Sequence, residues 1–312
     1  AEAALAFGSG MAAISATLLA HGRKGIVCVG DLYGGTQELL KNHCMALGIP
    51  VTFLFREEQN QLANELGEPG KLVYFETPAN PNMAILDIHA IAETAHQHGA
   101  LVAVDNTFAS PINQQPLELG ADLVLHSATK YLSGHSDITA GALMTSTERA
   151  KPVAAWRKNL GQLIAPETAA LLSRSLRTLP VRIRQHNENA MAVAEAMEQH
   201  PKITKVHYPG LPSFEGHDLA QQQMTGFGGM LSIEVEGGQQ AAEKVADSLK
   251  IFLLATSLGG VESLVSQPSA TSHHGLSHEE RLKRGIGDGM LRLSVGLEDA
   301  EDLIADLNQA LS

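Results

Sequence analysis

The chain has 312 residues, 44% of them hydrophobic, so it can bury a substantial core, and we expect it to form two domains. Its formal net charge of −12 argues against nucleic acid or an anionic membrane surface as the main partner. No apolar run approaches the ~20 residues of a membrane span, and the first residues do not resemble a secretory signal.

The first half of the chain alternates short apolar runs with longer helical patterns. The opening residues, AEAALAFGSGM, follow a helix-like pattern and lack an initiator methionine, so we expect a further segment upstream. Five β-rich runs predict strands at 26–29, 51–55, 72–75, 101–104 and 123–125. Helices are predicted near 11–21, 36–47 and 87–98, the last one followed by Gly99 as a stop signal. This alternation predicts a mainly parallel, doubly wound α/β sheet with helices on both faces.

The second half has a different pattern. Residues 165–200 are strongly helical, and strands are then predicted at 230–238, 250–257 and 290–296, before a closing helix at 299–311. This change predicts a smaller C-terminal α+β domain that is entered through a long helix. We expect residues 1–175 to form the α/β domain and residues 176–312 the α+β domain.

The cysteines and histidines give no sign of a metal centre. Cys28 and Cys44 have neither metal-binding nor redox spacing, and we expect reduced, structural thiols in a cytoplasmic protein. His273 and His274 are adjacent, but no third ligand accompanies them, so ordinary solvated histidines are expected and no metal site is predicted.

Polar residues gather directly after three predicted strands, where open α/β sheets bind their ligands. The segments are 76–81 after the strand at 72–75, 105–107 after 101–104, and 126–130 after 123–125. In addition, Ser9-Gly10-Met11 precedes a predicted helix whose N–H groups would hold an anion. A phosphate site, a strand-end carboxylate at Asp105 and an amine at Lys130 together point to pyridoxal phosphate.

Eight motifs follow one another along the chain. They are SGM (9–11), DLYGGT (31–36), ETPANP (76–81), VDNTF (104–108), HSATKYLSGHSD (126–137), HYPGL (207–211), SLGGVESL (257–264) and RLSVGLED (292–299). In this order they resemble the Cys/Met-metabolism family of pyridoxal-phosphate enzymes, which includes cystathionine γ-synthase, cystathionine γ- and β-lyase and methionine γ-lyase. The resemblance implies a fold-type-I enzyme with a large, mainly parallel-sheet domain and a smaller C-terminal α+β domain.

The resemblance also implies which residues bind the cofactor, pyridoxal 5′-phosphate. Lys130 would be the Schiff-base lysine and would move protons at Cα and Cβ of the substrate. Asp105 would pair with the ring nitrogen, with Thr107 beside it, and Tyr33 would stack on the ring and take part in proton transfer. The phosphate would be held by backbone N–H groups and hydroxyls of Gly10, Met11, Ser127 and Thr129.

The substrate carboxylate would be bound by Asn80 and Arg292, with Asn80 also near the ring hydroxyl and Ser257 supporting Lys130 or the carboxylate. Ordinary alternatives stay open for single residues. Lys130 alone would be read as a surface lysine, and Tyr33 as a core aromatic. Arg292 has Glu298 and Asp299 nearby and would serve equally as a structural ion-pair arginine.

The expected reaction lies in methionine and cysteine metabolism and amino-acid biosynthesis. SGHSD (133–137) resembles the cystathionine enzymes and methionine γ-lyase more than the O-acetylhomoserine sulfhydrylases. Gly35 stands where methionine γ-lyases usually carry cysteine, whereas Thr256 stands where cystathionine γ-synthase and γ-lyase usually carry glutamate. We favour a carbon–sulfur lyase acting by β- or γ-elimination on cystathionine, methionine or a related amino acid. Cystathionine γ-synthase is the alternative.

Two other classes of protein fit the sequence less well. A nucleotide-binding dehydrogenase would need a G-x-G-x-x-G turn directly after a strand, and none stands in that context. A cofactor-free scaffold would not need Lys130. The resemblance further implies a homo-oligomer, a tetramer of two intimate dimers with sites shared between subunits. We expect the family's N-terminal arm, with its phosphate-binding tyrosine and arginine, to lie upstream of residue 1.

Overall fold

The computed structural model describes residues 1–271, 275 and 277–312, which form two compact units. The first unit comprises residues 1–79 and 86–177, and the second comprises residues 80–85 and 178–312. Segment 80–85 therefore belongs to the second unit, although the chain on both sides of it belongs to the first. In the described part of the chain, no helix has the length and apolar character needed to cross a membrane.

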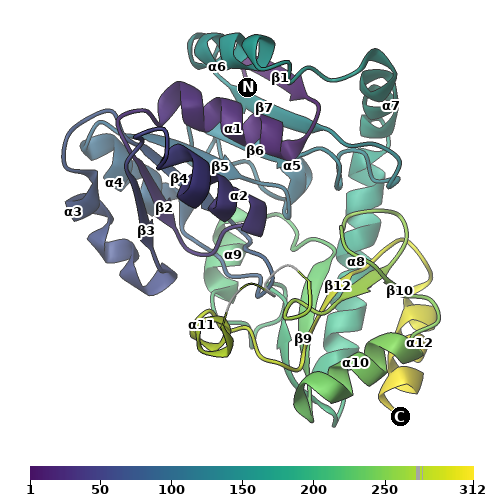
Figure 1. The fold of residues 1–312 in the computed structure, drawn as a ribbon. Coiled ribbons are helices and arrows are strands. Elements are labelled where there is room, and N and C mark those ends of the chain that lie inside the picture. Colours follow the sequence, from purple (N-terminus) through teal and green to yellow (C-terminus); the bar gives the residue numbers. More distant parts are fainter. Residues whose placement is uncertain (272–274, 276) are drawn as a thin grey trace. The chain divides into compact units, whose positions relative to one another are not determined.

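The first unit is built on a seven-stranded sheet in the order β1-β7-β6-β5-β4-β2-β3 (Figure 1). The two pairs made by β7 are antiparallel and the other neighbouring pairs are parallel. The predicted, mainly parallel sheet is thus confirmed. Its strands are β1 (Ala3–Phe7), β2 (Ile26–Val29), β3 (Val51–Leu54), β4 (Leu72–Glu76), β5 (Leu101–Asp105), β6 (Leu123–Ser127) and β7 (Gly141–Thr145).

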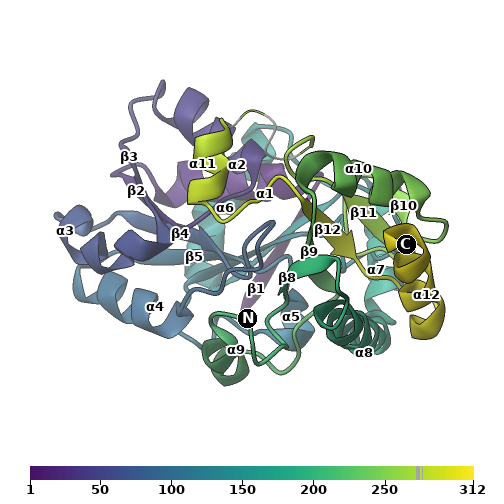
Figure 2. The same ribbon diagram turned by 90° about the horizontal axis from the view of Figure 1, so that it is seen from below.

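Helices cover both faces of this sheet (Figures 1 and 2). On one face lie α1 (Gly10–His21) and α6 (Thr147–Asn159), and on the other α3 (Leu62–Leu66) and α4 (Ile88–Gln97). Successive side chains of β2 point to opposite faces of the sheet. Cys28 packs with α1, whereas Val27 and Val29 pack with α3 and α4. The other helical segments are α2 (Gly34–Glu38), the π-helix Leu39–Cys44, the 3₁₀-helix Arg56–Gln61, α5 (Ser110–Asn113) and α7 (Pro166–Leu176).

The opening residues form a strand, so the helix-like reading of this stretch was wrong. Ala3–Phe7 pairs antiparallel with β7, with Leu5 opposite Leu143. Alanine and leucine favour helices, but a helix of five residues is marginal by itself, and the ladder with β7 satisfies the backbone instead. The helical stretch at 165–200 is likewise two helices, because Pro180 lies in the first turn of a new one, α8 (Leu179–Glu198).

The second unit contains a five-stranded sheet in the order β10-β11-β12-β9-β8. The strands are β8 (Ile203–His207), β9 (Met230–Val235), β10 (Leu253–Leu254), β11 (Leu264–Ser266) and β12 (Met290–Ser294), and only β10 and β11 pair in parallel. Helices α8 and α10 (Gly238–Ser248) pack on this sheet, α12 (Ala300–Leu311) packs against both of these helices, and α9 (His217–Gln223) and α11 (His278–Lys283) are shorter. This confirms the smaller α+β arrangement.

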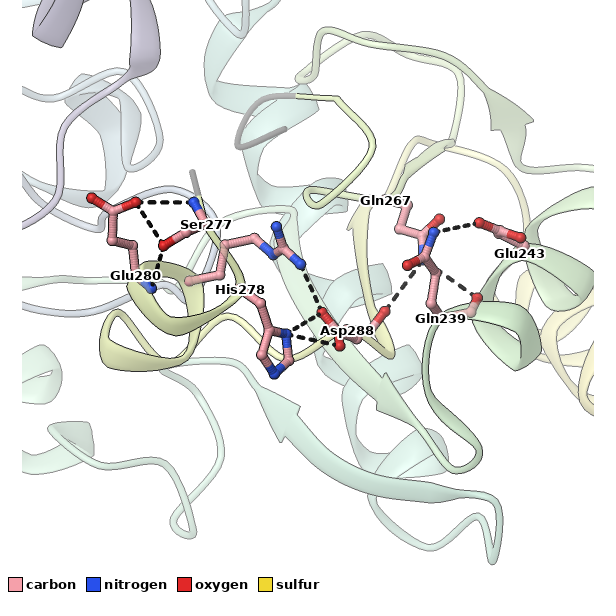
Figure 3. A network of polar contacts seen from close by, with 8 residues as sticks. Gln239, Glu243, Gln267, Ser277, His278, Glu280 and Asp288 are labelled. Atoms are coloured by element: carbon pink, nitrogen blue, oxygen red, sulfur yellow. Dashed lines mark hydrogen bonds and ion pairs between the residues drawn. The ribbon is translucent and has the colours of Figure 1, made fainter. Parts of the chain in front are cut away.

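Polar contacts fix α11 within the second unit (Figure 3). Ser277 caps the helix and bonds Glu280 in both directions, as in a capping box. Arg281 and His278 both contact Asp288, and the Arg281 guanidinium is the main reason that the pKa of Asp288 is lowered. These contacts are structural. The pair His273-His274 lies outside the described residues, and the described part of the chain holds no group of three metal-ligating side chains.

Candidate active site

Three polar side chains lie at the carboxyl ends of neighbouring strands in the first unit. Glu76 ends β4, Asp105 ends β5 and Ser127 ends β6, and Glu76 is directly paired with Asp105. Two residues earlier, Tyr74, Ala103 and Leu125 all belong to the core beneath α1. Because side chains alternate along a strand, the three polar residues face the α1 side of the sheet as well. The strand ends therefore bring two carboxyls and a hydroxyl together on one face.

The carboxylate of Asp105 is held by one neighbouring residue. Its Oδ1 accepts hydrogen bonds from the Thr107 N–H at 2.9 Å and the Thr107 hydroxyl at 2.5 Å. Withdrawal from water raises the pKa of Asp105 to about 6, although both Thr107 bonds favour the charged form. The same hydroxyl accepts from the Ser127 N–H at 2.8 Å. Thr107 thus ties Asp105 to the end of β6.

Lys130 follows β6 in a tight turn and is half-buried. Its N–H donates to the Ser127 carbonyl at 3.1 Å, and its own carbonyl accepts from the Gly134 N–H at 2.8 Å. The backbone on both sides of Lys130 is therefore fixed to the strand end that carries Ser127. A partly buried lysine in this turn does not fit the surface-lysine reading.

The start of α1 lies against Ser127. A side chain at Gly10 would place its Cβ 2.9 Å from the Ser127 Cβ, so only glycine permits this close approach. Ser9 caps the helix by accepting the Ala12 N–H at 3.0 Å. The N–H groups of Gly10 and Met11 come first in the helix, where no intrahelical acceptor exists, and they can bind an anion together with the Ser127 hydroxyl.

The hydroxyl of Thr129, a predicted phosphate residue, is bonded to the backbone of Ala140. It donates to the Ala140 carbonyl at 3.2 Å and accepts the Ala140 N–H at 3.0 Å. These contacts bind the lysine turn to the chain just before β7. The sequence motif alone gives no sign of them, because Ala140 lies eleven residues further on.

Tyr33 precedes α2 and its side chain is 50% exposed, so it is not the core aromatic of the ordinary reading. Its N–H donates to Oε1 of Glu76 at 3.0 Å. The hydroxyl of Thr36 in α2 points to the Met11 sulfur at 3.9 Å, which connects α2 with the start of α1. The structure thus gathers Tyr33, Met11 and the three strand-end residues on one face. The contact made by Glu76 was missed, although period-two alternation along β4 would have placed its side chain on this face.

In the second unit, Arg292 on β12 is almost fully buried. Its Nη1 donates to Oδ1 of Asn80 at 3.0 Å and its Nη2 to the Ser257 carbonyl at 2.9 Å. The Ser232 hydroxyl on β9 donates to the Pro81 carbonyl at 2.7 Å, which holds segment 80–85 on this unit. Arg292, Asn80 and Ser257 therefore form one cluster, with the cationic guanidinium bonded to two neutral oxygens.

The other partners proposed for Arg292 from the sequence are engaged elsewhere. Glu298 accepts the Ser263 N–H at 2.7 Å and the Ser263 hydroxyl at 2.8 Å, and Asp299 caps α12. Ser257 has φ = 85°, a left-handed conformation that costs energy for a non-glycine residue. The bond from Arg292 to its carbonyl helps to hold that conformation.

The first-unit residues fit pyridoxal phosphate. The start of α1 and Ser127 form an anion cradle that leaves no room for a side chain at residue 10. Asp105 at the end of β5 offers a carboxylate that would pair with the ring nitrogen, and the Lys130 turn follows directly after Ser127 at the end of β6. The donor set therefore matches the phosphate, the ring nitrogen and the aldehyde of this cofactor.

Comparison with known proteins gives one consistent result. The family model for Cys/Met metabolism PLP-dependent enzymes matches residues 1–312. An L-methionine gamma-lyase of Fusobacterium nucleatum subsp. polymorphum is 43% identical over 99% of this chain and 80% of its own. A cystathionine gamma-lyase of Bacillus subtilis is 42% identical over 99% of this chain and 82% of its own. The crystal structure of cystathionine gamma synthase from Xanthomonas oryzae pv. oryzae with cystathionine superposes with a TM-score of 0.94, at 43% identity, covering 99% of this chain and 80% of that one.

Proposed function

This chain belongs to the Cys/Met-metabolism family of PLP-dependent enzymes, and on that premise we propose that it is a carbon–sulfur lyase acting on a sulfur amino acid. The observation that carries the proposal is the gathering of Asp105, Thr107, Ser127 and the start of α1 on one face of the sheet, with the Lys130 turn following directly. Cystathionine, methionine and related compounds are the proposed substrates, because relatives named for both are similarly close.

We propose that pyridoxal phosphate is held in the first unit by residues of these strand ends and helices. Asp105 would keep the ring nitrogen protonated, Tyr33 would stack on the ring, and Lys130 would bind the aldehyde carbon through its amine. The phosphate would lie among Gly10, Met11, Ser127 and Thr129. Thr129 would have to exchange its hydroxyl bond to Ala140 for one to the phosphate, or contribute through its backbone.

Chemistry at the substrate requires proton transfers that side chains of this chain can perform. When bound, pyridoxal phosphate takes up the electron density released as the substrate loses its α-proton. Lys130 is proposed to act as the general base at Cα of the substrate and, for γ-elimination, to move a proton at Cβ. Tyr33 is the proposed acid that protonates the departing sulfur. Half-exposure of Tyr33 leaves its phenol accessible to a substrate.

In the second unit, Arg292 is proposed to bind the substrate carboxylate, with Asn80 and Ser257 holding its guanidinium in place. Arg292→Ala is expected to raise KM and lower kcat/KM by about 2–5 kcal/mol, the range for truncating one partner of a buried charge pair. Steady-state kinetics on methionine and cystathionine would measure this. Arg184→Ala, which removes an exposed arginine of α8 in the same unit, is the control. Equal kinetic constants for both variants would refute the role of Arg292.

The choice of substrate is proposed to depend partly on Thr256, which is exposed and directly precedes Ser257. Family members that act on cystathionine usually carry glutamate there, and its charge would meet the distal amine of that substrate. We therefore expect no strong preference for cystathionine over methionine in this protein. Thr256→Glu should shift the ratio of kcat/KM values towards cystathionine, and Thr256→Gln, of equal size but uncharged, should not. A wild-type preference for cystathionine of several orders of magnitude would show that other residues recognise the distal amine.

Product analysis tests the proposed reaction most directly. With cystathionine or methionine, a lyase releases a thiol, ammonia and a 2-oxo acid, whose four or three carbons distinguish γ- from β-elimination. With an acylated homoserine and cysteine, a γ-synthase forms cystathionine and releases no ammonia. We expect the first set of products. Formation of cystathionine alone would favour the alternative, cystathionine γ-synthase.

We also propose that the protein is a cytoplasmic homo-oligomer, and by family resemblance a homotetramer. Several large apolar side chains of the first unit, around the end of α6 and along α7, support a protein interface because they are at least 38% exposed. They are Leu160, Leu163, Leu171 and Leu176. Sedimentation equilibrium measures the assembly directly. Cys28 and Cys44 are both buried and free, as expected of a reducing compartment.

A further inference from the structure

Glu76 is a buried carboxyl in the candidate site to which the proposed reaction gives no role. Its residue is 8% exposed, and it stands at the end of β4 beside Asp105 on β5. Its Oε1 accepts two hydrogen bonds, from the Tyr33 N–H at 3.0 Å and from the Tyr74 hydroxyl at 3.4 Å. Glu76 therefore connects the sheet to the residue that precedes α2.

The Tyr33 carbonyl is held by α2, because it accepts the N–H groups of Thr36 at 2.9 Å and Gln37 at 3.0 Å, so the bond from its N–H to Glu76 fixes the other side of the same residue. Its side chain is half exposed, and it makes no side-chain capping bond to α2. The ring lies so close to Gly35 that a Cβ there would be 2.7 Å from the Tyr33 Cε1. A side chain at residue 35 would have to push the ring away. The bond from the Tyr33 N–H to Glu76 thus fixes the Tyr33 backbone. The absence of a side chain at Gly35 leaves space for the Tyr33 ring.

The charges around Glu76 favour its protonated form. Burial is the main reason that its pKa is raised well above the usual value, and the neighbouring carboxylate of Asp105 raises it further. The bonds from Tyr33 and Tyr74 act in the opposite direction, and Asp31 adds a smaller unfavourable charge. Cys28 on β2 and Tyr74 face the same region, and burial raises the pKa of both, so neither adds a charge at neutral pH.

Asp105 differs from Glu76 in the features that decide which of the two carries the charge. Asp105 is less buried, and the two bonds from Thr107 stabilise its anion. Two adjacent buried carboxylates would repel each other, so one of the pair holds the proton. Greater burial assigns that proton to Glu76.

We propose that Glu76 is the positioning residue of Tyr33, a protonated carboxyl that fixes the Tyr33 backbone through Oε1 and leaves the negative charge of the strand-end pair on Asp105. Its catalytic consequence rests on the function proposed above, in which Tyr33 transfers protons. We assign Glu76 itself no contact with substrate or cofactor. It acts through the placement of Tyr33 and through its lack of charge beside Asp105.

The placement of Tyr33 can be measured without cofactor. Hydrogen exchange of the Tyr33 amide, followed by mass spectrometry with fragmentation in the cofactor-free protein, should be roughly tenfold faster in Glu76→Ala than in wild type, because the bond to Oε1 is lost. Glu76→Gln retains an oxygen acceptor of the same shape and should restore the protection. Glu58→Ala is the control, since it removes a carboxylate that accepts the Phe55 N–H at 2.9 Å far from Tyr33 in the sequence. Unchanged Tyr33 exchange in Glu76→Ala would overturn the proposal.

Activity and pH dependence test the consequence. With the cofactor bound, Glu76→Ala should lower kcat about tenfold with little change in KM, because the proton transfer and not substrate binding is impaired. Glu76→Gln should recover most of kcat. In this variant, the affinity for pyridoxal phosphate should still fall as the pH falls through about 6, the pKa to which Asp105 is raised, and this fall is the acid limb of cofactor binding. A limb that moves to lower pH in Glu76→Gln would show that Glu76 was charged, against the proposal.

The proposed function and the role of Glu76 can be refuted separately. A wild-type protein that neither binds pyridoxal phosphate nor releases a thiol from any sulfur amino acid would refute the function. The exchange rate of the Tyr33 amide in Glu76→Ala and Glu76→Gln would still decide whether Glu76 positions Tyr33.

Discussion

Lys130→Ala is expected to lower kcat by roughly 10³-fold or more, the largest effect of any single substitution in this chain. In the proposed assignment, the variant lacks both the amine that would hold the cofactor and the base that would take the α-proton, and general-base catalysis alone contributes about 10²–10⁴-fold. Thiol release from methionine or cystathionine, measured with added pyridoxal phosphate, gives the rate.

The matched controls are Lys151→Ala and Lys158→Ala, which remove lysines of α6 without touching the strand ends. Both should retain near-normal turnover. If Lys130→Ala kept a wild-type rate while one of these variants lost it, the assignment of the cofactor lysine would be wrong.

Asp105→Asn is expected to have the second largest effect. An amide cannot stabilise a protonated ring nitrogen, and losing one partner of a buried charge pair costs about 2–5 kcal/mol, or roughly 1.5–3.5 decades in rate. Single-turnover and steady-state rates should both fall while the fold is retained. Asp87→Asn is the control, because Asp87 caps α4 by accepting the Ala90 N–H and asparagine caps equally well.

The pKa of Asp105 also predicts a pH effect with a definite sign. Since its pKa is raised to about 6 in the cofactor-free protein, the carboxylate is charged above this pH and neutral below it. Only the charged form pairs with a protonated ring, so affinity for pyridoxal phosphate should fall as the pH falls through about 6. A phosphorylated side chain has a second pKa of about 6, and the cofactor phosphate is expected to titrate in the same range. It would account for any loss of affinity at low pH that remains in Asp105→Asn. An identical acid limb in wild type and Asp105→Asn would contradict the assignment.

The raised pKa of Asp105 has a corresponding effect on stability. A carboxyl whose pKa is higher in the folded than in the unfolded state favours folding at low pH, and that contribution is lost as the pH rises through about 6. In the cofactor-free protein, Asp105→Asn should therefore make the free energy of unfolding less sensitive to pH between about 4 and 6, the interval between the two pKa values. Urea titrations at several pH values would measure this difference.

The hydrophobic pattern located most strands of the first unit, but it ended three of them too early. The runs predicted at 72–75, 101–104 and 123–125 stop at the last apolar residue, whereas β4, β5 and β6 continue through Glu76, Asp105 and Ser127. Apolar patterning reports burial, but the hydrogen-bonded ladder continues through polar residues, as the pairing of Glu76 with Asp105 shows. β1 was missed for a different reason, because its alanine- and leucine-rich sequence favours a helix and only the ladder with β7 stabilises the strand.

Contacts between distant parts of the chain could not be predicted from spacing. Segment 80–85 joins the second unit because Ser232 bonds Pro81 and Arg292 bonds Asn80, over separations of 151 and 212 residues. The sequence motifs identified Thr107 and Thr129 as site residues. They did not predict that the Thr107 hydroxyl joins Asp105 to the Ser127 backbone, or that the Thr129 hydroxyl binds Ala140. Side-chain hydrogen bonds of this kind depend on the folded geometry, which a single sequence does not contain.

The central claim is that Lys130 holds pyridoxal phosphate, and peptide mapping after borohydride reduction tests it most directly. Reduction fixes the bound cofactor on the amine that holds it, and digestion followed by tandem mass spectrometry identifies the labelled lysine. We expect the pyridoxyl group on Lys130 in the wild-type protein and no stoichiometric label in Lys130→Ala. A stoichiometric label on Lys151, Lys158 or another lysine, with Lys130 unmodified, would contradict the account.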